Sequence, residues 1–447
     1  MNRKIELPGH VEHIIEVLNG NGFEAYAVGG CVRDALLGRE PGDWDITTSA
    51  APQEVKRLFS HTVDTGLLHG TVTVMLDRCG YEVTTYRIDG EYEDGRHPKS
   101  VEFTTSLAED LRRRDFTINA MAYSHESGII DLFGGMEDLQ GGVIRCVGCA
   151  MDRFGEDALR ILRAIRFSAQ LGFSIEEETK KAISQIAPNL RMVSMERIQT
   201  ELSKLLVSSH PEAYRQVWET GVGAVILPEF DDLMEVTQNN PYHDATVGEH
   251  TLKMLTLTPP DRFLRWAALL HDVGKKSTKK TEADGREFFP GHAEEGARLA
   301  KAILKRLKMD NETIDKVSRL IRWHAYPFRA DKPCVRGALN QAGEDIFGDL
   351  LILMEADTRA QSSFEQQMRL EELYRVKDLY REIVEAGECF SLKGLAVNGN
   401  DLMAAGIKPG RHMGRLLSRL LNDVILDQSV NTKEELLRRA FLYEKEQ

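Results

Sequence analysis

The chain has 447 residues and a net charge of −13, with 42% hydrophobic and 28% charged residues. This composition is typical of a globular protein of about three domains, and it excludes a disordered or fibrous chain. No apolar run approaches the length of ~18 residues that is needed to cross a bilayer, and the N-terminal segment has no hydrophobic core like that of a signal peptide. Six cysteines are too few for a disulfide framework. We therefore expect a cytoplasmic protein without membrane contact. The acidic balance argues mildly against nucleic-acid binding, but binding follows local patches rather than totals.

Residues 1–145 alternate short apolar runs with turns, which predicts an α/β domain. AYAVGG, TVTVML and YEVTTYR are expected to be strands. GGCVRDALLG predicts a glycine turn that opens a helix ending near Gly38. The polar, turn-rich segment 88–106 is expected to be a mobile loop.

From Phe154 onward the periodicity becomes helical. EDALRILRAIRFSAQLG predicts one helix over 156–172 that is capped by Gly172. No internal repeat is present. We predict four parts: an α/β head at 1–145, a helical neck at 146–227, a helical body at 228–387 and a helical tail at 388–447.

Gly29, Gly30 and Arg33 lie where a predicted strand ends and a helix begins. Glycines let the backbone approach a phosphate closely, the helix N-terminus offers free N–H donors, and an arginine adds a charged fork. Glycines also occur at such joins for steric reasons alone, so the motif by itself leaves both interpretations open.

Asp43 and Asp45 follow in DWD. In a strand, residues two apart share a face, so both carboxylates would converge, either on a hard cation or in mutual repulsion. Glu82, which shares a face with Thr84 and Tyr86, could supply a third acid, and three acids can hold two Mg²⁺ ions. The alternative is a surface turn.

The segment LRRRDFTINAMA predicts helix packing through Ile118 and Met121, with Arg113, Arg114 and Asp115 in or near the first turn. Basic residues suit a helix N-terminus poorly unless an anion binds there. The alternative is a surface ion pair between Arg113 and Asp115, which would contribute little.

The predicted neck helix has one apolar arc and one charged arc. The apolar arc contains Leu159, Ile161, Leu162, Ile165 and Ala169, and the charged arc contains Asp157, Arg160, Arg163 and Arg166. Asp157 and Arg160 are three apart and hence neighbours, one an acceptor and the other a donor, and together they could read a base edge. The alternative is a solvated face with internal salt bridges.

In the body, His271 and Asp272 end an apolar helix, with His250 and His292 each 21 residues away. His324 and Asp357 follow. A single buried histidine is more often a core residue than a ligand. Several of them, with His271 and Asp272 adjacent and Asp357 on a later helix, suit a metal cluster better.

Four motifs together resemble one family. GGCVRDALLG, DWDITT, LRRRDFTINAMA and FGEDALRILRAIRFSAQLGF resemble the class II tRNA nucleotidyltransferases, which comprise CCA-adding enzymes and bacterial poly(A) polymerases. The order H…HD…D, with HDVGK, resembles the HD phosphohydrolase superfamily. The resemblance implies a polymerase-β-like head with a mixed sheet, followed by an all-helical neck, an HD body and a tail.

The resemblance also implies roles for individual residues. In the head, Asp43 and Asp45 would hold catalytic Mg²⁺ with Glu82 as the third carboxylate, Gly30 and Arg33 would contact the triphosphate, and Arg113 and Arg114 would contact the nucleotide. In the neck, Asp157 and Arg160 would select CTP and ATP, and Arg163 and Arg166 would face phosphates or the primer end. In the body, His250, His271, Asp272 and Asp357 would hold a divalent transition metal, with His292 and His324 as second-metal ligands.

Two further segments have roles in the resembled family. Loop 88–106 matches the loop needed to add the terminal A. In the tail, Arg411, Arg415 and Arg419 form one basic stripe at spacing i, i+4, i+8, which could bind tRNA phosphates. A solvated helix face explains the stripe equally well.

The expected function is a CCA tRNA nucleotidyltransferase that adds C, C and A to tRNA from CTP and ATP without a nucleic acid template. An HD phosphohydrolase side activity is left open. The alternatives are a poly(A) polymerase, a CC-adding or A-adding enzyme, and a metal-dependent HD phosphohydrolase whose head only binds nucleotides. A nucleotidylyltransferase that modifies a protein and a non-catalytic tRNA chaperone agree less well with the motifs. The sequence indicates no oligomeric state.

Overall fold

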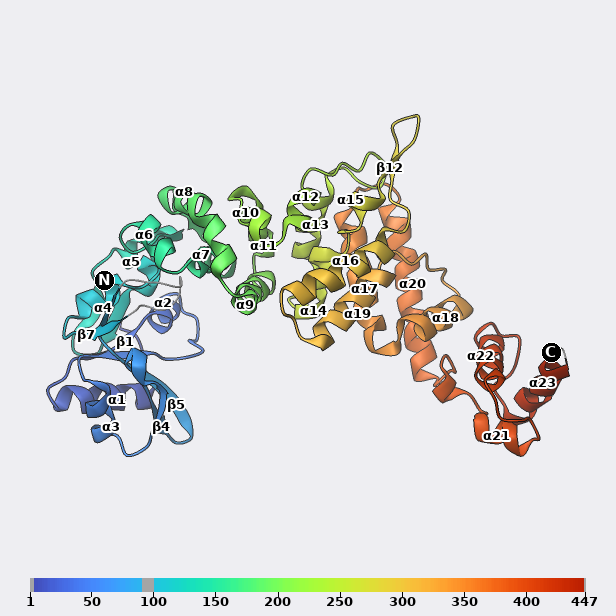
Figure 1. Ribbon diagram of the computed structural model, residues 1–447, viewed down its shortest axis with the longest axis horizontal. Helices are drawn as coiled ribbons and strands as arrows, with labels where there is room; N and C mark the ends of the chain where they lie inside the picture. Colours follow the sequence, from blue (N-terminus) through green and yellow to red (C-terminus); the bar gives the residue numbers. More distant parts are fainter. Residues whose placement is uncertain (1–3, 91–99, 446–447) are drawn as a thin grey trace. The chain divides into compact units, whose positions relative to one another are not determined.

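The computed structural model describes residues 4–90 and 100–445. The chain divides into two compact units, Met1–Pro228 and Glu229–Gln447. The first unit contains the predicted head and neck, and the second contains the predicted body and tail (Figure 1). The finer division into four parts stays a prediction.

A mixed seven-stranded sheet forms the head, in the order β3-β4-β5-β2-β1-β8-β9. Strands β2 and β5 are parallel, and the other neighbours are antiparallel. The strands are β1 Ala25–Val28, β2 Ile46–Thr48, β3 Thr62–Gly66, β4 Thr71–Leu76, β5 Cys79–Thr85, β8 Met121–Ser124 and β9 Gly128–Asp131. The expected strands AYAVGG, TVTVML and YEVTTYR correspond to β1, β4 and β5.

Among the described residues of the head, five helices accompany this sheet: α1 Gly9–Gly20, α2 Gly30–Leu36, α3 Pro52–Leu58, α4 Leu107–Arg112 and α5 Gly135–Gly141. Helix α2 is the one predicted after the glycine turn, and Gly38 follows it with φ +70°. One face of the sheet is buried against α4, because Val28, Tyr86 and Ala122 cluster there with Leu107 and Leu111. This packing holds the end of β1, beside which the candidate site lies.

The predicted mobile loop 88–106 begins and ends in regular structure. Strand β6 Arg87–Asp89 pairs antiparallel with β7 Val101–Phe103, with Ile88 opposite Glu102. The loop prediction is therefore wrong for its two ends, which backbone pairing orders. Residues 91–99 lie outside the described residues.

The helix predicted within LRRRDFTINAMA is also wrong. The segment contains the C-terminus of α4, a short 3-10 turn η2 Thr117–Asn119 and strand β8. Alanine and methionine favour helices locally, but Ala122 pairs with Val28 and Tyr123 with Ala27 in the sheet. Tertiary strand pairing overrides local propensity here.

The neck is helical, as predicted, but its central helix is broken. Helix α6 Ala150–Glu156 ends before Asp157, whose backbone is extended, and α7 Leu159–Leu171 follows. The predicted apolar arc of α7 is buried, and Gly172 caps the helix with φ +72°. Strand β10 Val143–Ile144, at the end of the head, pairs parallel with β11 Ser174–Ile175 of the neck. The remaining neck elements are α8 Glu177–Ile186, η3 Ala187–Met192, α9 Met195–Leu206, η4 Pro211–Tyr214, α10 Arg215–Glu219 and α11 Gly223–Ile226.

The body is a helical bundle with one short hairpin (Figure 1). Helix α16 packs on α17, α13 on α19, and α14 on both α17 and α19. Its elements are α12 Pro228–Leu233, α13 Val247–Leu257, α14 Arg262–Leu270, α15 Lys275–Thr278, β12 Lys280–Thr281, β13 Glu287–Phe288, α16 His292–Arg306, α17 Asn311–Trp323, α18 Lys332–Ala342, α19 Glu344–Ala360 and α20 Gln366–Glu385. No helix within the described ranges is long and apolar enough to cross a membrane.

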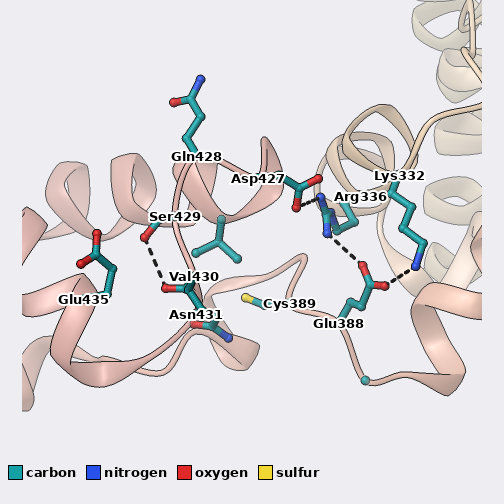
Figure 2. Close-up of a pocket in the computed structure, with 12 residues that line it drawn as sticks. Lys332, Arg336, Glu388, Cys389, Asp427, Gln428, Ser429, Val430, Asn431 and Glu435 are labelled. Carbon is teal, nitrogen blue, oxygen red and sulfur yellow. Dashed lines mark hydrogen bonds and ion pairs between the residues drawn. The ribbon is translucent and has the colours of Figure 1, made fainter.

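The tail has its own apolar core and a polar joint with the body. Its helices are α21 Gly399–Ala404, α22 His412–Ile425 and α23 Lys433–Lys445, preceded by the 3-10 turn η5 Leu392–Gly394. Val397, Leu420 and Leu436 are buried together. At the joint, Arg336 of α18 reaches the end of α22 beside a cavity of about 700 Å³ (Figure 2).

Candidate functional site

The glycine turn after β1 brings two arginines together. Gly29 has φ +85°, a conformation that favours glycine, and a Cβ there would lie 2.9 Å from Arg114 Nη1. The buried Arg33 donates from Nη1 to Asn119 Oδ1 at 2.6 Å, and from Nε and Nη2 to Asp34. Two guanidinium groups therefore lie near the N-terminus of α2, an arrangement suited to an anionic ligand.

Two of the predicted acidic residues, Asp45 and Glu82, lie on the same face of neighbouring strands. The backbone N–H of Val28 donates to the Asp45 carbonyl at 3.0 Å, so the ladder continues one residue before β2. Asp45 thus shares a face with Thr47, which lies opposite Thr84 of β5. Glu82, two residues before Thr84, is on this face as well.

These acids influence one another electrostatically. Burial raises the pKa of Asp45, with Asp43 raising it further and Arg114 opposing both. Burial and the charges of Asp45 and Asp43 raise the pKa of Glu82. Within the described residues, the carboxylate oxygens of Asp43, Asp45 and Glu82 do not all lie within 4.8 Å of one another. Carboxylates that repel each other in this way suit a divalent cation, which would relieve the repulsion.

The ion pairs that hold the RRD segment do not join Arg113 to Asp115. Arg113 donates from Nε and Nη2 to Asp110 Oδ1, at 3.0 and 2.7 Å. The Oδ2 atom of Asp115 accepts hydrogen bonds from Nε and Nη2 of Arg163, at 2.9 and 2.6 Å. Burial alone would raise the pKa of Asp115, but Arg163 outweighs burial and lowers it to about 2. The alternative interpretation, a surface ion pair between Arg113 and Asp115, is therefore wrong.

Asp157 and Arg160 lie at the break between α6 and α7. Asp157 Oδ1 accepts from the Leu159 backbone N–H at 3.0 Å, which explains the break, because an aspartate competes for backbone donors at a helix start. Its Oδ2 accepts from Arg197 Nη2 at 2.7 Å. Arg160 Nη1 donates to Glu156 Oε2. The pair is three residues apart, as predicted, but it does not lie along one continuous helix.

The structure separates Arg163 from Arg166. The Arg163 side chain is 35% exposed, whereas that of Arg166 is 8% exposed. Arg166 donates to Glu201 from Nε and to Gln170 from Nη1. The expectation that Arg166 faces phosphates is thus at odds with its burial inside the neck.

Sequence reasoning missed three supporting residues. Asn119 accepts from Arg33 and donates from Nδ2 to Asp115 Oδ1 at 3.1 Å, which links the glycine turn to the RRD segment. Arg197 and Glu201 lie on α9 and bind residues of the neck motif. No local pattern identifies them, because their partners are 40 and 35 residues away in sequence.

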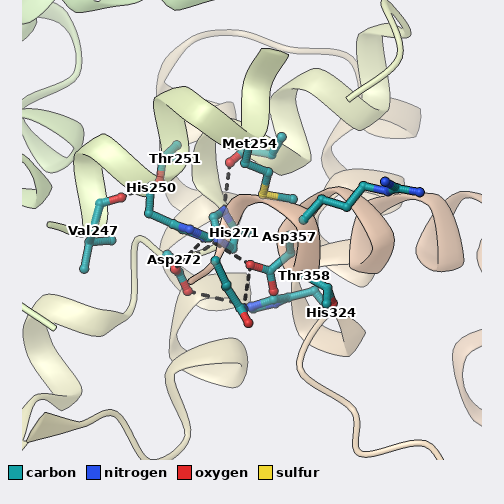
Figure 3. Close-up of polar contacts among 12 residues, drawn as sticks. Val247, His250, Thr251, Met254, His271, Asp272, His324, Asp357 and Thr358 are labelled. Atoms are coloured by element: carbon teal, nitrogen blue, oxygen red, sulfur yellow. Dashed lines mark hydrogen bonds and ion pairs between the residues drawn. The ribbon is translucent and has the colours of Figure 1, made fainter. Parts of the chain in front are cut away.

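The predicted histidines and aspartates of the body converge, although they come from separate elements (Figure 3). They form two groups that share Asp272: His250 and His271 complete one, and His292 and His324 complete the other. In each group the ligand atoms all lie within 4.8 Å of one another. Asp357 Oδ1 lies 3.0 Å from His250 Nε2.

Backbone carbonyls orient three of these imidazole rings. Nδ1 of His271, His292 and His324 lies 2.8, 2.8 and 2.6 Å from the carbonyls of Ala268, Phe289 and Ile321, respectively. With Nδ1–H donating, Nε2 carries the lone pair and faces the cluster, as a metal ligand requires. The donor set of imidazole nitrogens and carboxylates suits a divalent transition metal.

A cavity of about 380 Å³ opens beside the cluster. His243, which sequence reasoning missed, lines it with its ring 5.2 Å from that of His250. Burial, with the charges of Lys275 and His250, lowers the pKa of His243 to about 3. The buried Lys275 Nζ lies 2.7 Å from Asp272 Oδ2 and donates to Gln238. The cavity therefore joins the cluster to a buried ammonium group.

The tail presents the predicted basic stripe. Arg411, Arg415 and Arg419 are all exposed on or just before α22. The guanidinium of Arg419 lies 3.6 Å from the ring centroid of Tyr443. The stripe is thus available to a polyanion, with one arginine braced by an aromatic ring.

Family models match most of the chain. The Poly A polymerase head domain matches residues 25–145. The RNA and SrmB-binding site of polymerase A matches 172–234, and tRNA nucleotidyltransferase domain 2 matches 293–440. The mixed sheet, its acidic edge and these matches define the class: a nucleotidyltransferase with a polymerase-type head.

Relatives resolve the class to a family. The chain is 36% identical to the CCA-adding enzyme of Limosilactobacillus fermentum over 446 residues, covering 98% of each. It is 36% identical to that of Enterococcus faecalis, covering 95% and 93%. It matches the crystal structure of the Bacillus stearothermophilus CCA-adding enzyme in complex with CTP, at 31% identity and TM-score 0.74 over 98% of both chains. The chain belongs to the family of CCA-adding enzymes.

Proposed function

We propose that this protein adds C, C and A to the 3′ end of tRNA, using CTP and ATP and no nucleic acid template, in the cytoplasm. The observation that carries the proposal is the position of three mutually repelling carboxylates beside a glycine turn with two arginines. Relatives support the substrates: the Bacillus stearothermophilus structure contains CTP, and a Thermotoga maritima CCA-adding enzyme of the same fold was solved with tRNA.

In this proposal, Asp43 and Asp45 hold Mg²⁺ and Glu82 supports them. The bound Mg²⁺ would activate the terminal ribose hydroxyl and stabilise charge on the departing pyrophosphate. Arg33 and the backbone N–H groups at the start of α2 bind the triphosphate, and Arg114 lies between this turn and Asp45. Arg113, which donates to Asp110, would contact the nucleotide.

Asp157 and Arg160 would choose the base. A carboxylate accepts from the exocyclic amino group of cytosine or adenine, and a guanidinium donates to the neighbouring ring nitrogen. Uracil and guanine present a carbonyl oxygen at the first position and a ring N–H at the second, so both contacts fail. Arg197 supports this role by fixing Asp157 Oδ2. Arg163, one turn further along α7 and 35% exposed, would face phosphates or the primer end.

The Asp43→Asn variant tests the head assignment. It keeps the side-chain shape but removes a charged Mg²⁺ ligand, so we expect nucleotide addition to fall by about a hundredfold or more. Binding of tRNA, measured by filter retention, should change by less than about twofold, because it relies on contacts elsewhere. Normal addition by this variant would overturn the metal assignment.

The nearest alternatives are a poly(A) polymerase and an enzyme that adds only CC or only A. These share the head chemistry and differ in the product. The chain matches two relatives over nearly their whole length, and both are named CCA-adding enzymes, which favours the full CCA product.

A second function is supported by the body cluster. We propose that His250, His271, Asp272 and Asp357 bind a divalent transition metal, with His292 and His324 at a second position. Bound metal would activate water for phosphoester hydrolysis. Two observations favour this proposal. Backbone carbonyls orient three of the imidazole rings, and a cavity lies beside the cluster.

Metal content and hydrolysis test this second function. The wild-type protein, loaded with Mn²⁺ or Ni²⁺ and dialysed, should retain metal and hydrolyse a nucleoside 2′,3′-cyclic phosphate. His271→Ala should lose both, whereas His210→Ala, at an exposed histidine outside the cluster, should lose neither. Metal retention without hydrolysis would limit the body to a structural metal site, and no retention would overturn the proposal.

We also propose that the stripe of Arg411, Arg415 and Arg419 binds tRNA phosphates. The exposure of all three supports this role. A Gln substitution at each should weaken tRNA binding and reduce its salt dependence.

A further inference from the structure

Three arginines surround the ring of Phe167 on α7. The guanidinium carbons of Arg166, Arg33 and Arg163 lie 4.0, 4.9 and 5.4 Å from its centroid. All three are within the range of about 6 Å in which a cation is attracted to an aromatic ring. Phe167 is only 6% exposed, so little water screens these contacts.

A second aromatic residue fixes the orientation of this ring. Phe116 meets Phe167 edge to face, with centroids 5.8 Å apart and an interplanar angle of 82°. Phe116 is fully buried in the RRDFT segment, and its N–H donates to Asp115 Oδ1. The head thus holds one ring and the neck helix holds the other.

The arrangement brings together like charges from two elements. Arg33 comes from α2, where Asp34 and Asn119 bind it, and Arg163 comes from α7, where Asp115 binds it. The shared ring attracts both guanidinium groups and offsets part of their repulsion. If the ring is removed, Arg33 keeps its polar partners but loses the contact that ties it to α7.

We propose that Phe167 is a positioning residue that holds the Arg33 guanidinium for the triphosphate of the incoming nucleotide. The inference rests on the proposed function, which assigns Arg33 to the triphosphate. Phe167 acts through the arginine and does not touch the nucleotide. Its loss should therefore weaken nucleotide binding for CTP and ATP alike and leave the chemical step largely intact.

Steady-state kinetics of nucleotide addition by the full chain test this inference. Phe167→Met keeps most of the volume without the aromatic face, so KM for both nucleotides should rise about fivefold to tenfold, with kcat within about twofold. Phe167→Tyr keeps the aromatic face and should restore most of the loss. Phe173→Leu removes a ring that lies near Gly142, 3.5 Å from where a Cβ would stand at that glycine, and its KM should match the wild type.

A double variant separates this inference from the proposed function. If Phe167 acts through Arg33, Phe167→Met should add little to KM when Arg33→Ala is already present. Three results would each overturn the inference. The effects of Phe167→Met and Arg33→Ala on KM could be fully additive, KM could be unchanged in Phe167→Met, or a folded Phe167→Tyr could fail to restore KM. A normal KM in Arg33→Ala would instead overturn the triphosphate assignment.

Discussion

At the scale of single residues, the head site depends on close contacts that tolerate no added atom. Gly29 meets two requirements at once, a positive φ and room for Arg114. Asn119 binds Arg33 on one side and Asp115 on the other. Asn119 therefore links the position of the glycine turn to that of the RRD segment.

Gly29→Ala should impair both stability and nucleotide addition. The backbone at Gly29 has φ +85° and ψ −131°, a region almost restricted to glycine, so alanine there should cost about 1 to 3 kcal/mol, and the new Cβ would displace Arg114. Gly22→Ala is the control for a positive φ alone, because Gly22 has φ +86° with nothing within 4 Å of its Cβ position. Thermal unfolding should show a loss in both variants, at least as large in Gly29→Ala, and only Gly29→Ala should lose addition. Equal activity in the two variants would contradict the role given to Arg114.

Asp115 should make the head sensitive to acid. Its pKa is about 2 in the folded protein, below the usual value near 3.9, so its ion pair with Arg163 stabilises the fold above pH 4. The contribution, about 2 kcal/mol at neutral pH, is lost as the pH falls through 4 toward 2. The stability gap between the wild type and Asp115→Asn should narrow by about 1 kcal/mol from pH 5 to pH 3, as measured by unfolding. A constant gap would show that the pKa is not lowered.

At the scale of elements, the joint between body and tail depends on one buried arginine (Figure 2). Arg336 donates to the Ile425 carbonyl, the last residue of α22, and pairs with Glu388 and Asp427. This arrangement caps α22 and attaches it to α18. The tail's apolar core lies beyond this contact.

Arg336→Met should loosen the tail by about 2 to 4 kcal/mol, because it removes the donor to the Ile425 carbonyl and leaves Glu388 with Lys332 but without its buried arginine partner. Limited proteolysis should then cleave near residues 387–391 faster than in the wild type. Lys332→Met removes a more exposed partner of Glu388 and should cost less than about 1 kcal/mol. If both variants resist cleavage near residues 387–391 equally well, the stability of the tail does not depend on Arg336.

Much of the element pattern could be predicted from sequence, and the exceptions have physical causes. The glycine turn, strands β1, β4 and β5 and the buried arc of α7 follow from local periodicity. The strand at Met121–Ser124 could not be predicted, because its partner Val28 is remote in sequence. The break at Asp157 depends on a side chain binding its own backbone. Asn119, Phe167 and His243 gain their roles only from contacts across the fold.

At the scale of the whole molecule, the two candidate chemistries belong to separate units. The carboxylates and arginines of nucleotide addition lie within residues 1–228, and the histidine–aspartate cluster lies within 229–447. The two share no residue. Each unit also has its own buried core, so a change at one chemical centre should leave the other folded.

Asp272→Asn should therefore spare nucleotide addition while abolishing metal retention by the body. Asp272 is the residue common to both ligand groups, so its loss removes each of them. Addition rates should stay within about twofold of the wild type, provided that circular dichroism shows an intact fold. A complete loss of addition in a folded variant would mean that the cluster supports the head.

The most direct test of the central claim is the sequence of the product. Purified protein would receive Mg²⁺, a tRNA lacking its CCA end, and each nucleoside triphosphate alone and in mixture, and the 3′ ends would then be sequenced. The account predicts defined CCA ends, with no use of GTP or UTP. Long A tails, ends that stop at CC, or incorporation of G or U would contradict it, the last by removing base selection from Asp157 and Arg160.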